Sequence, residues 1–69
     1  MKYNGVQYPD VTVRLSGEDG NVFSIIGRVT AAMKKAGYRE AATQFAEDAM
    51  KAESYDAVLQ LVMRTVSTR

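Results

Sequence analysis

Residues 22–37 read VFSIIGRVTAAMKKAG, and this stretch decides the fold. Its main apolar residues follow one another at intervals of one or three positions, which places them on one face of a helix. Asn21 precedes the stretch and can cap the first turn, while Gly37 can adopt the left-handed conformation that ends a helix. The pattern predicts a helix over residues 22–36. Its apolar face comprises Val22, Ile25, Ile26, Val29, Ala32, Met33 and Ala36, widened by Phe23.

Two further helices are predicted after Gly37, over residues 39–52 and 55–66. The buried stripe of the second consists of Tyr38, Ala41, Ala42, Phe45, Ala49 and Ala52. The stripe of the third consists of Tyr55, Val58, Leu59, Val62 and Val66, and Ser54 is its expected N-cap. Leu61 and Met63 extend this stripe on both sides. We therefore expect the third helix to be central in the fold or to contact a partner.

The N-terminal residues predict β structure. Residues 11–15 alternate strictly, with Val11, Val13 and Leu15 on one face and Thr12 and Arg14 on the other. They predict a half-buried strand.

A hairpin at Asn4-Gly5 is possible, because this pair favours a tight turn. Pro9 would keep the second strand of that hairpin short, since proline cannot donate a backbone hydrogen bond.

The expected architecture is an α+β fold in which a short N-terminal β element packs on three helices. The chain of 69 residues is small enough to form a single domain over residues 1–69. Because it has no cysteine, a disulfide cannot support so small a core, and self-association as a homodimer remains possible. The predicted core is Val13, Leu15, Phe23, Ile26, Val29, Met33, Phe45, Leu59 and Val62.

Composition argues against catalysis and against a bound metal or cofactor. The chain contains neither histidine nor cysteine, which removes the usual general base and the thiolate nucleophile. Glu40 and Glu47 share a helix surface seven positions apart, as expected of solvated side chains. We expect no enzyme activity, no cofactor and no metal. No apolar run approaches the roughly 18 residues of a membrane span, so we expect no membrane contact and a cytoplasmic location.

Charge is strongly segregated along the chain. Residues 21–39 carry four basic side chains and no acidic one, whereas residues 40–56 carry five acidic side chains and one lysine. The basic set is the candidate partner surface. Solvent, an oppositely charged protein and nucleic acid are its three possible partners. Its members are Arg28, Lys34, Lys35 and Arg39.

Gly27 lies inside the first predicted helix, where glycine costs about 1 kcal/mol relative to alanine. Close approach of another backbone would compensate for this cost. The expectation from sequence is a close contact within the protein, ahead of a contact with a bound partner.

Residues 8–11 (YPDV), 17–29 (GEDGNVFSIIGRV) and 36–37 (AG) resemble a family of small bacterial proteins of similar length. That family includes open reading frames from phages and mobile elements. The resemblance implies a single domain in the bacterial cytosol and implies no chemistry. We therefore expect a non-enzymatic, protein-binding accessory module of bacterial or mobile-element origin.

The order of strand, helix, glycine turn and helix also resembles a ribbon-helix-helix DNA-binding dimer. In that case Thr12 and Arg14 would be the nucleic-acid contacts in the major groove. The long acidic loop after the strand and the third apolar helix are departures from that pattern. A small DNA-binding regulator is therefore the alternative function, and nucleic acid is the less favoured partner.

Overall fold

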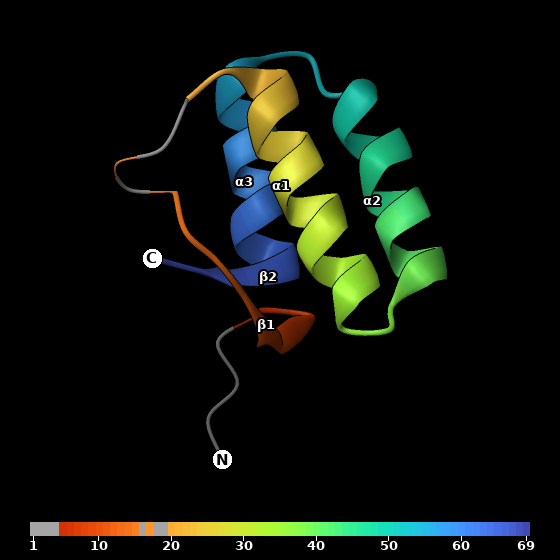
Figure 1. The fold of residues 1–69 in the computed structure, drawn as a ribbon. Coiled ribbons are helices and arrows are strands. Elements are labelled where there is room, and N and C mark those ends of the chain that lie inside the picture. Colours follow the sequence, from red (N-terminus) through yellow and green to blue (C-terminus); the bar gives the residue numbers. More distant parts are fainter. Residues whose placement is uncertain (1–4, 16, 18–19) are drawn as a thin grey trace.

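A computed structural model describes residues 5–15, 17 and 20–69. The elements in chain order are β1 (Tyr8–Val13), α1 (Val22–Lys35), α2 (Arg39–Met50), α3 (Tyr55–Thr65) and β2 (Val66–Thr68). The three helices lie side by side, and the two short strands lie together beside the lower end of α3 (Figure 1). This arrangement confirms the predicted α+β fold.

The three helices begin at the predicted residues because their local signals act as expected. Asn21 Oδ1 accepts hydrogen bonds from the backbone N–H of Phe23 at 2.8 Å and of Ser24 at 3.4 Å. Ser54 Oγ accepts one from the N–H of Ala57 at 3.0 Å. Gly37 has φ of 97°, the left-handed conformation that commonly follows the end of a helix, and it follows the end of α1. Each helix ends one or two residues earlier than predicted.

The sheet differs from the prediction in two ways. The N-terminal strand covers Tyr8–Val13 rather than residues 11–15, so it includes Pro9 and ends before Arg14. The chain also returns after α3 to form β2, which was not predicted and which pairs with β1 in parallel.

The pairing of β1 with β2 is irregular between Tyr8 and Thr12, the segment that contains Pro9. Proline has no N–H to donate in a strand pairing, and its carbonyl here accepts a hydrogen bond from the Ser67 hydroxyl at 3.0 Å. Beyond it, the Arg69 N–H donates to the Val13 carbonyl at 3.1 Å. The N- and C-terminal parts of the chain are therefore joined directly.

The possible hairpin at Asn4-Gly5 falls partly outside the described residues. Gly5 has φ of 81°, the left-handed conformation that such a turn requires. Residues 1–4, which include the first strand of that hairpin, are not described.

The core lies between the helices and the inner face of the strands. The predicted core was wrong at three positions. Phe23 is 68% exposed, and Leu15 and Leu59 are only half-buried. The remaining predicted core residues are buried. They are joined there by Val11, Ile25, Ala42, Ala49, Val58 and Val66.

Candidate protein-interaction surface

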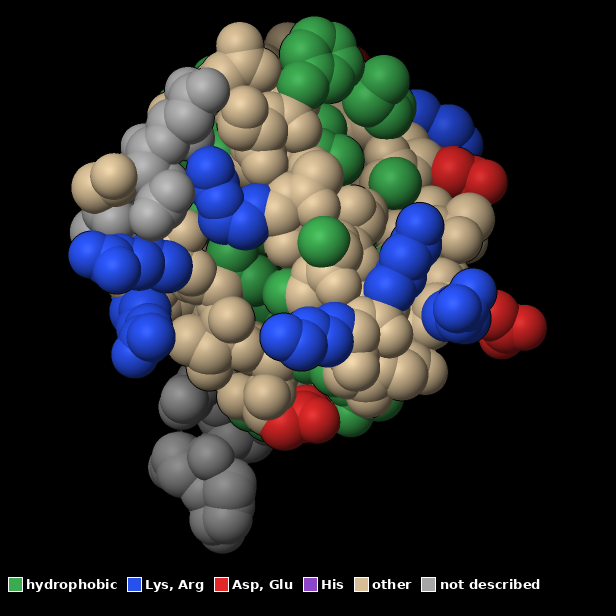
Figure 2. Space-filling model, viewed as in Figure 1, with side chains coloured by type: hydrophobic (Ala, Val, Ile, Leu, Met, Phe, Trp, Pro, Cys, Tyr) green, Lys and Arg blue, Asp and Glu red, His purple; other side chains and the backbone are tan. Residues whose placement is uncertain are grey.

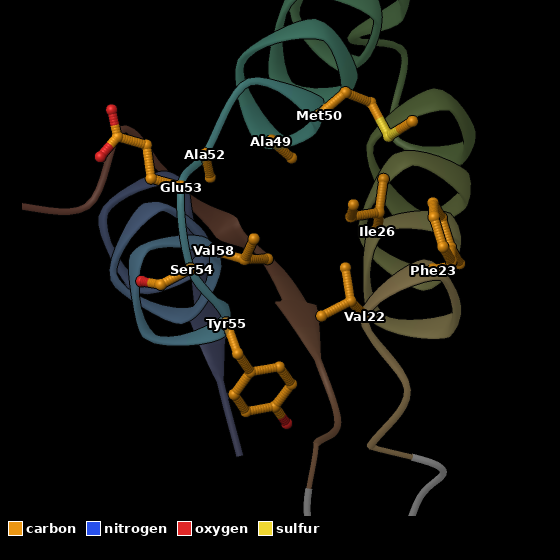
Figure 3. Close-up of a pocket in the computed structure, with 10 residues that line it drawn as sticks. All are labelled: Val22, Phe23, Ile26, Ala49, Met50, Ala52, Glu53, Ser54, Tyr55 and Val58. Carbon is orange, nitrogen blue, oxygen red and sulfur yellow. The ribbon is translucent and has the colours of Figure 1, made fainter.

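Three large hydrophobic side chains are exposed at one end of the helical layer. Phe23 is 68% exposed, Met50 is 62% exposed and Tyr55 is 46% exposed. They come from the start of α1, the end of α2 and the start of α3, which meet at this end (Figures 1 and 3). We call these three residues the apolar end. Several large exposed hydrophobic side chains at one end of a small domain make that end a candidate interaction site.

The apolar end borders an open groove of about 190 Å³. Val22 and Ile26 of α1 face Val58 of α3 across it, while Phe23 points away along the outer side of α1 (Figure 3). The carboxylate of Glu53 stands on the opposite rim from α1. Pockets that enclose a small molecule usually measure about 300–1,000 Å³, so this groove suits a side chain of a partner rather than a buried cofactor.

Beyond Phe23, small residues follow along the outer surface of α1. Phe23, Gly27 and Ala31 are all exposed and are spaced four residues apart, so they form one stripe along the helix. The predicted internal contact of Gly27 is wrong, because, apart from its chain neighbours and the nearby backbone of α1 itself, no atom of the described residues lies within 4 Å of the position that a Cβ would occupy there. The φ of Gly27 is not in the positive range that favours glycine. Among the described residues, neither packing nor backbone conformation requires a glycine at this position.

The basic residues do not form a single exposed ridge. Lys34, Lys35 and Arg39 are exposed, but Arg28 is half-buried and makes interactions of its own. The three exposed side chains lie where α1 ends and α2 begins, and we call them the basic end. On the face shown in Figure 2, hydrophobic side chains gather at the upper edge, with a Lys or Arg side chain beside them at the upper right. Further Lys and Arg side chains lie across the middle and lower parts, and Asp and Glu side chains lie at the right and at the lower edge.

The outer side of α2 also carries exposed residues and lies next to the outer stripe of α1. Met50 lines the groove together with Phe23, so this side of α2 lies beside the outer stripe of α1. Helical spacing places Glu47, Thr43 and Arg39 on the same side, and all three are exposed. Because α1 and α2 run in opposite directions, the end of α2 lies beside the start of α1 (Figure 1). Charges of both signs lie along the joint face, since exposed Lys51 follows Met50 and exposed Glu40 follows Arg39.

The two alternative nucleic-acid contacts are placed differently from the ribbon-helix-helix expectation. Thr12 is exposed on β1, next to Ser67 of β2, whereas Arg14 lies beyond the end of β1. The two residues therefore do not project from one strand.

An aromatic pair that sequence reasoning missed fixes the turn between α1 and α2. The rings of Tyr8 and Tyr38 are 4.6 Å apart at their centroids, and the Tyr38 hydroxyl donates to Asp10 Oδ2 at 2.7 Å. This hydrogen bond to a carboxylate raises the pKa of Tyr38, because it favours the neutral phenol that donates it. The pair ties β1 to the turn that carries the basic end. Its residues are 30 positions apart in sequence and carry no motif that signals the contact.

No protein-family model, curated protein or solved structure matches the chain significantly. Within the described part of the chain, no group of three acidic side chains is placed to hold a metal ion. Of the described helices, none has the length and apolar character needed to cross a membrane.

Proposed function

We propose that the protein is a non-enzymatic protein-binding module that binds its partner through the apolar end. The observation that carries this proposal is the exposure of Phe23, Met50 and Tyr55 around one open groove. Burying a large apolar side chain contributes about 1.5–3 kcal/mol, so three such residues are a substantial source of binding energy. A cytoplasmic accessory protein of bacterial or mobile-element origin is the setting that we propose for this function.

Charge supports a protein partner over nucleic acid. The groove has Glu53 on its rim, and Glu47 lies on the neighbouring outer side of α2. These two carboxylates outnumber the one exposed lysine beside the apolar end, Lys51, and would repel phosphate there. The three cations of the basic end lie at the opposite end of the face. They are few for sequence-independent DNA affinity, which grows with each neutralised phosphate.

The ribbon-helix-helix alternative has less support. In such a dimer the reading strands come from two chains, whereas here β1 pairs with β2 of its own chain. The exposed side chains that would read the groove, Thr12 and Arg14, are not both on that strand. Nucleic-acid binding remains the second hypothesis, and steep loss of affinity with salt would be its signature.

Photocrosslinking in cells that naturally produce the protein tests the proposed function. Phe23 is replaced by p-benzoylphenylalanine, which keeps an aromatic ring at an exposed position that tolerates the larger group. We expect covalent adducts heavier than the 7.6 kDa chain after illumination. The control carries the same probe at Met63, an exposed residue of α3 that does not line the groove. Equal labelling at both positions, or no adduct from position 23, would contradict the proposal.

A further inference from the structure

We propose that the partner segment that binds at the apolar end is basic. A large aliphatic side chain of this segment fills the groove, and a lysine or arginine close to it in the partner's sequence pairs with Glu53 on the rim. This inference rests on the proposed function, since it names the chemistry of the partner that the apolar end binds. The lining of the groove, the position of Glu53 and the balance of charge around it support the inference.

The walls of the groove are aliphatic. Val22 and Ile26 of α1 face Val58 of α3 across it (Figure 3). Ala49 of α2 and Ala52, just after that helix, line the side next to α2. A partner side chain that enters the groove therefore meets apolar atoms on three sides. Leucine, isoleucine or methionine suits these walls, whereas a charged side chain would lose its hydration against them.

Glu53 is the one charged residue among the described residues that line the groove. Its carboxylate points outward from the rim on the side opposite α1 (Figure 3), and it forms no hydrogen bond or ion pair with another described residue. It is therefore placed to pair with a residue that flanks the buried side chain, rather than with the buried side chain itself. A cation in that flanking position is attracted, and an acidic residue is repelled.

The charge around the groove also favours a basic segment. Residues 47–56, which run from the last turn of α2 into the first turn of α3, carry four acidic side chains and one lysine, all exposed. That lysine, Lys51, does not line the groove, and Asp48 faces a different groove, where it accepts a hydrogen bond from Gln44 at 3.0 Å. Three acidic side chains therefore remain against one lysine. Residues 22–26 of α1 add no charge to this end.

Selection of peptides on the purified full chain tests the inference. The probe is a phage-displayed library of random dodecapeptides, and a matched selection uses the Glu53→Lys variant. We expect the wild-type protein to select a leucine, isoleucine or methionine with a lysine or arginine within about three positions, which is roughly 10 Å of extended chain. The variant should lose this basic preference, because it places like charges together. Acidic sequences, an equal basic preference on both proteins, or no enrichment over an uncoated surface would overturn the inference.

Fluorescence anisotropy with the most enriched peptide then tests the apolar contact. Met50→Ser should raise the dissociation constant by about tenfold, because it removes a large apolar side chain that lines the groove. Met63→Ser is the matched control and should leave the constant unchanged, since Met63 is 47% exposed and does not line the groove. Equal weakening by the two substitutions would contradict binding in the groove.

The charge contact has a smaller expected effect. Glu53→Gln should raise the dissociation constant by about two- to fivefold, the range of an exposed ion pair. Glu40→Gln, at an exposed position near the start of α2 and outside the groove, is its control and should have no effect. A peptide whose basic residue is replaced by glutamine should bind the wild-type protein and Glu53→Gln equally. Weakening of this neutral peptide by Glu53→Gln to the same extent would show that the pair does not form. Circular dichroism confirms that each variant is folded.

The outcomes separate this inference from the proposed function. Adducts from position 23 together with selected peptides that lack basic residues would support protein binding and contradict a basic segment. Mass spectrometry of the adducts extends the decision to the natural partner. Attachment close to a lysine or arginine would support both proposals, and attachment within an acidic segment would contradict only this one. No adduct from position 23 would contradict the proposed function, whatever the selected peptides show.

Discussion

Replacing Met33 with alanine should lower the free energy of unfolding by about 2–5 kcal/mol. Met33 is 0% exposed and belongs to the cluster that joins the helices to the strands. The substitution removes buried apolar atoms and leaves a cavity that the surrounding side chains fill only in part. A domain of 69 residues has about 3–10 kcal/mol of stability in total, so this loss is a large fraction of it. Urea unfolding followed by circular dichroism measures the change.

The matched control for Met33 is the same substitution at Met63. Because Met63 is 47% exposed, Met63→Ala should change the free energy of unfolding by no more than about 0.5 kcal/mol. Equal effects at the two methionines would contradict the assignment of Met33 to the core.

A chain that ends at Thr65 should fail to fold cooperatively. The truncation removes β2 and with it Val66, which is 0% exposed and belongs to the core cluster. Loss of this side chain costs about 1.5–3 kcal/mol in burial. The freed backbone groups of β1 cost further stability because each net hydrogen bond contributes about 0.5–1.5 kcal/mol. Together these losses approach the stability of the whole domain. A broad thermal transition and reduced ellipticity are the expected results.

Thr68→Ala is the control for the truncation. It keeps the backbone that pairs with β1 and alters a half-buried side chain, so a cooperative transition should remain. A truncated chain that unfolds as cooperatively as the intact one would show that β2 does not support the fold.

The helices could be predicted from the sequence because their signals are local. Asn21, Ser54 and Gly37 define helix ends through bonds or backbone angles within a few residues. The apolar spacing identified Val29, Met33 and Val62 as core residues in the same way.

The second strand could not be predicted because its identity depends on a distant partner. Val66 follows Val62 by four residues, so its spacing fits the apolar stripe of a helix as well as it fits a strand. Its extended conformation, with φ of −133° and ψ of 163°, is stabilised by pairing with β1 at the other end of the sequence. A strand of three residues has too few positions to show a period of two.

The interaction surface was only partly predictable for a similar reason. The basic residues were identified from composition, but the half-burial of Arg28 depends on how α1 packs. Phe23 was assigned to the core because its position widens the apolar stripe. It is exposed because α1 carries it outward at the end of the layer, away from the residues that face one another across the groove (Figure 3).

Gly27→Gln tests most directly whether the outer face of α1 is kept free for a partner. Glutamine is a better helix former than glycine, and the described residues leave room for its Cβ. The variant should gain about 0.5–1 kcal/mol of stability. In a chain that also carries the photocrosslinking probe at position 23, the glutamine side chain one turn along the helix would hinder a partner, so the yield of covalent adducts should fall by about tenfold or more. A variant that is more stable and crosslinks as strongly as the chain with Gly27 would contradict the account.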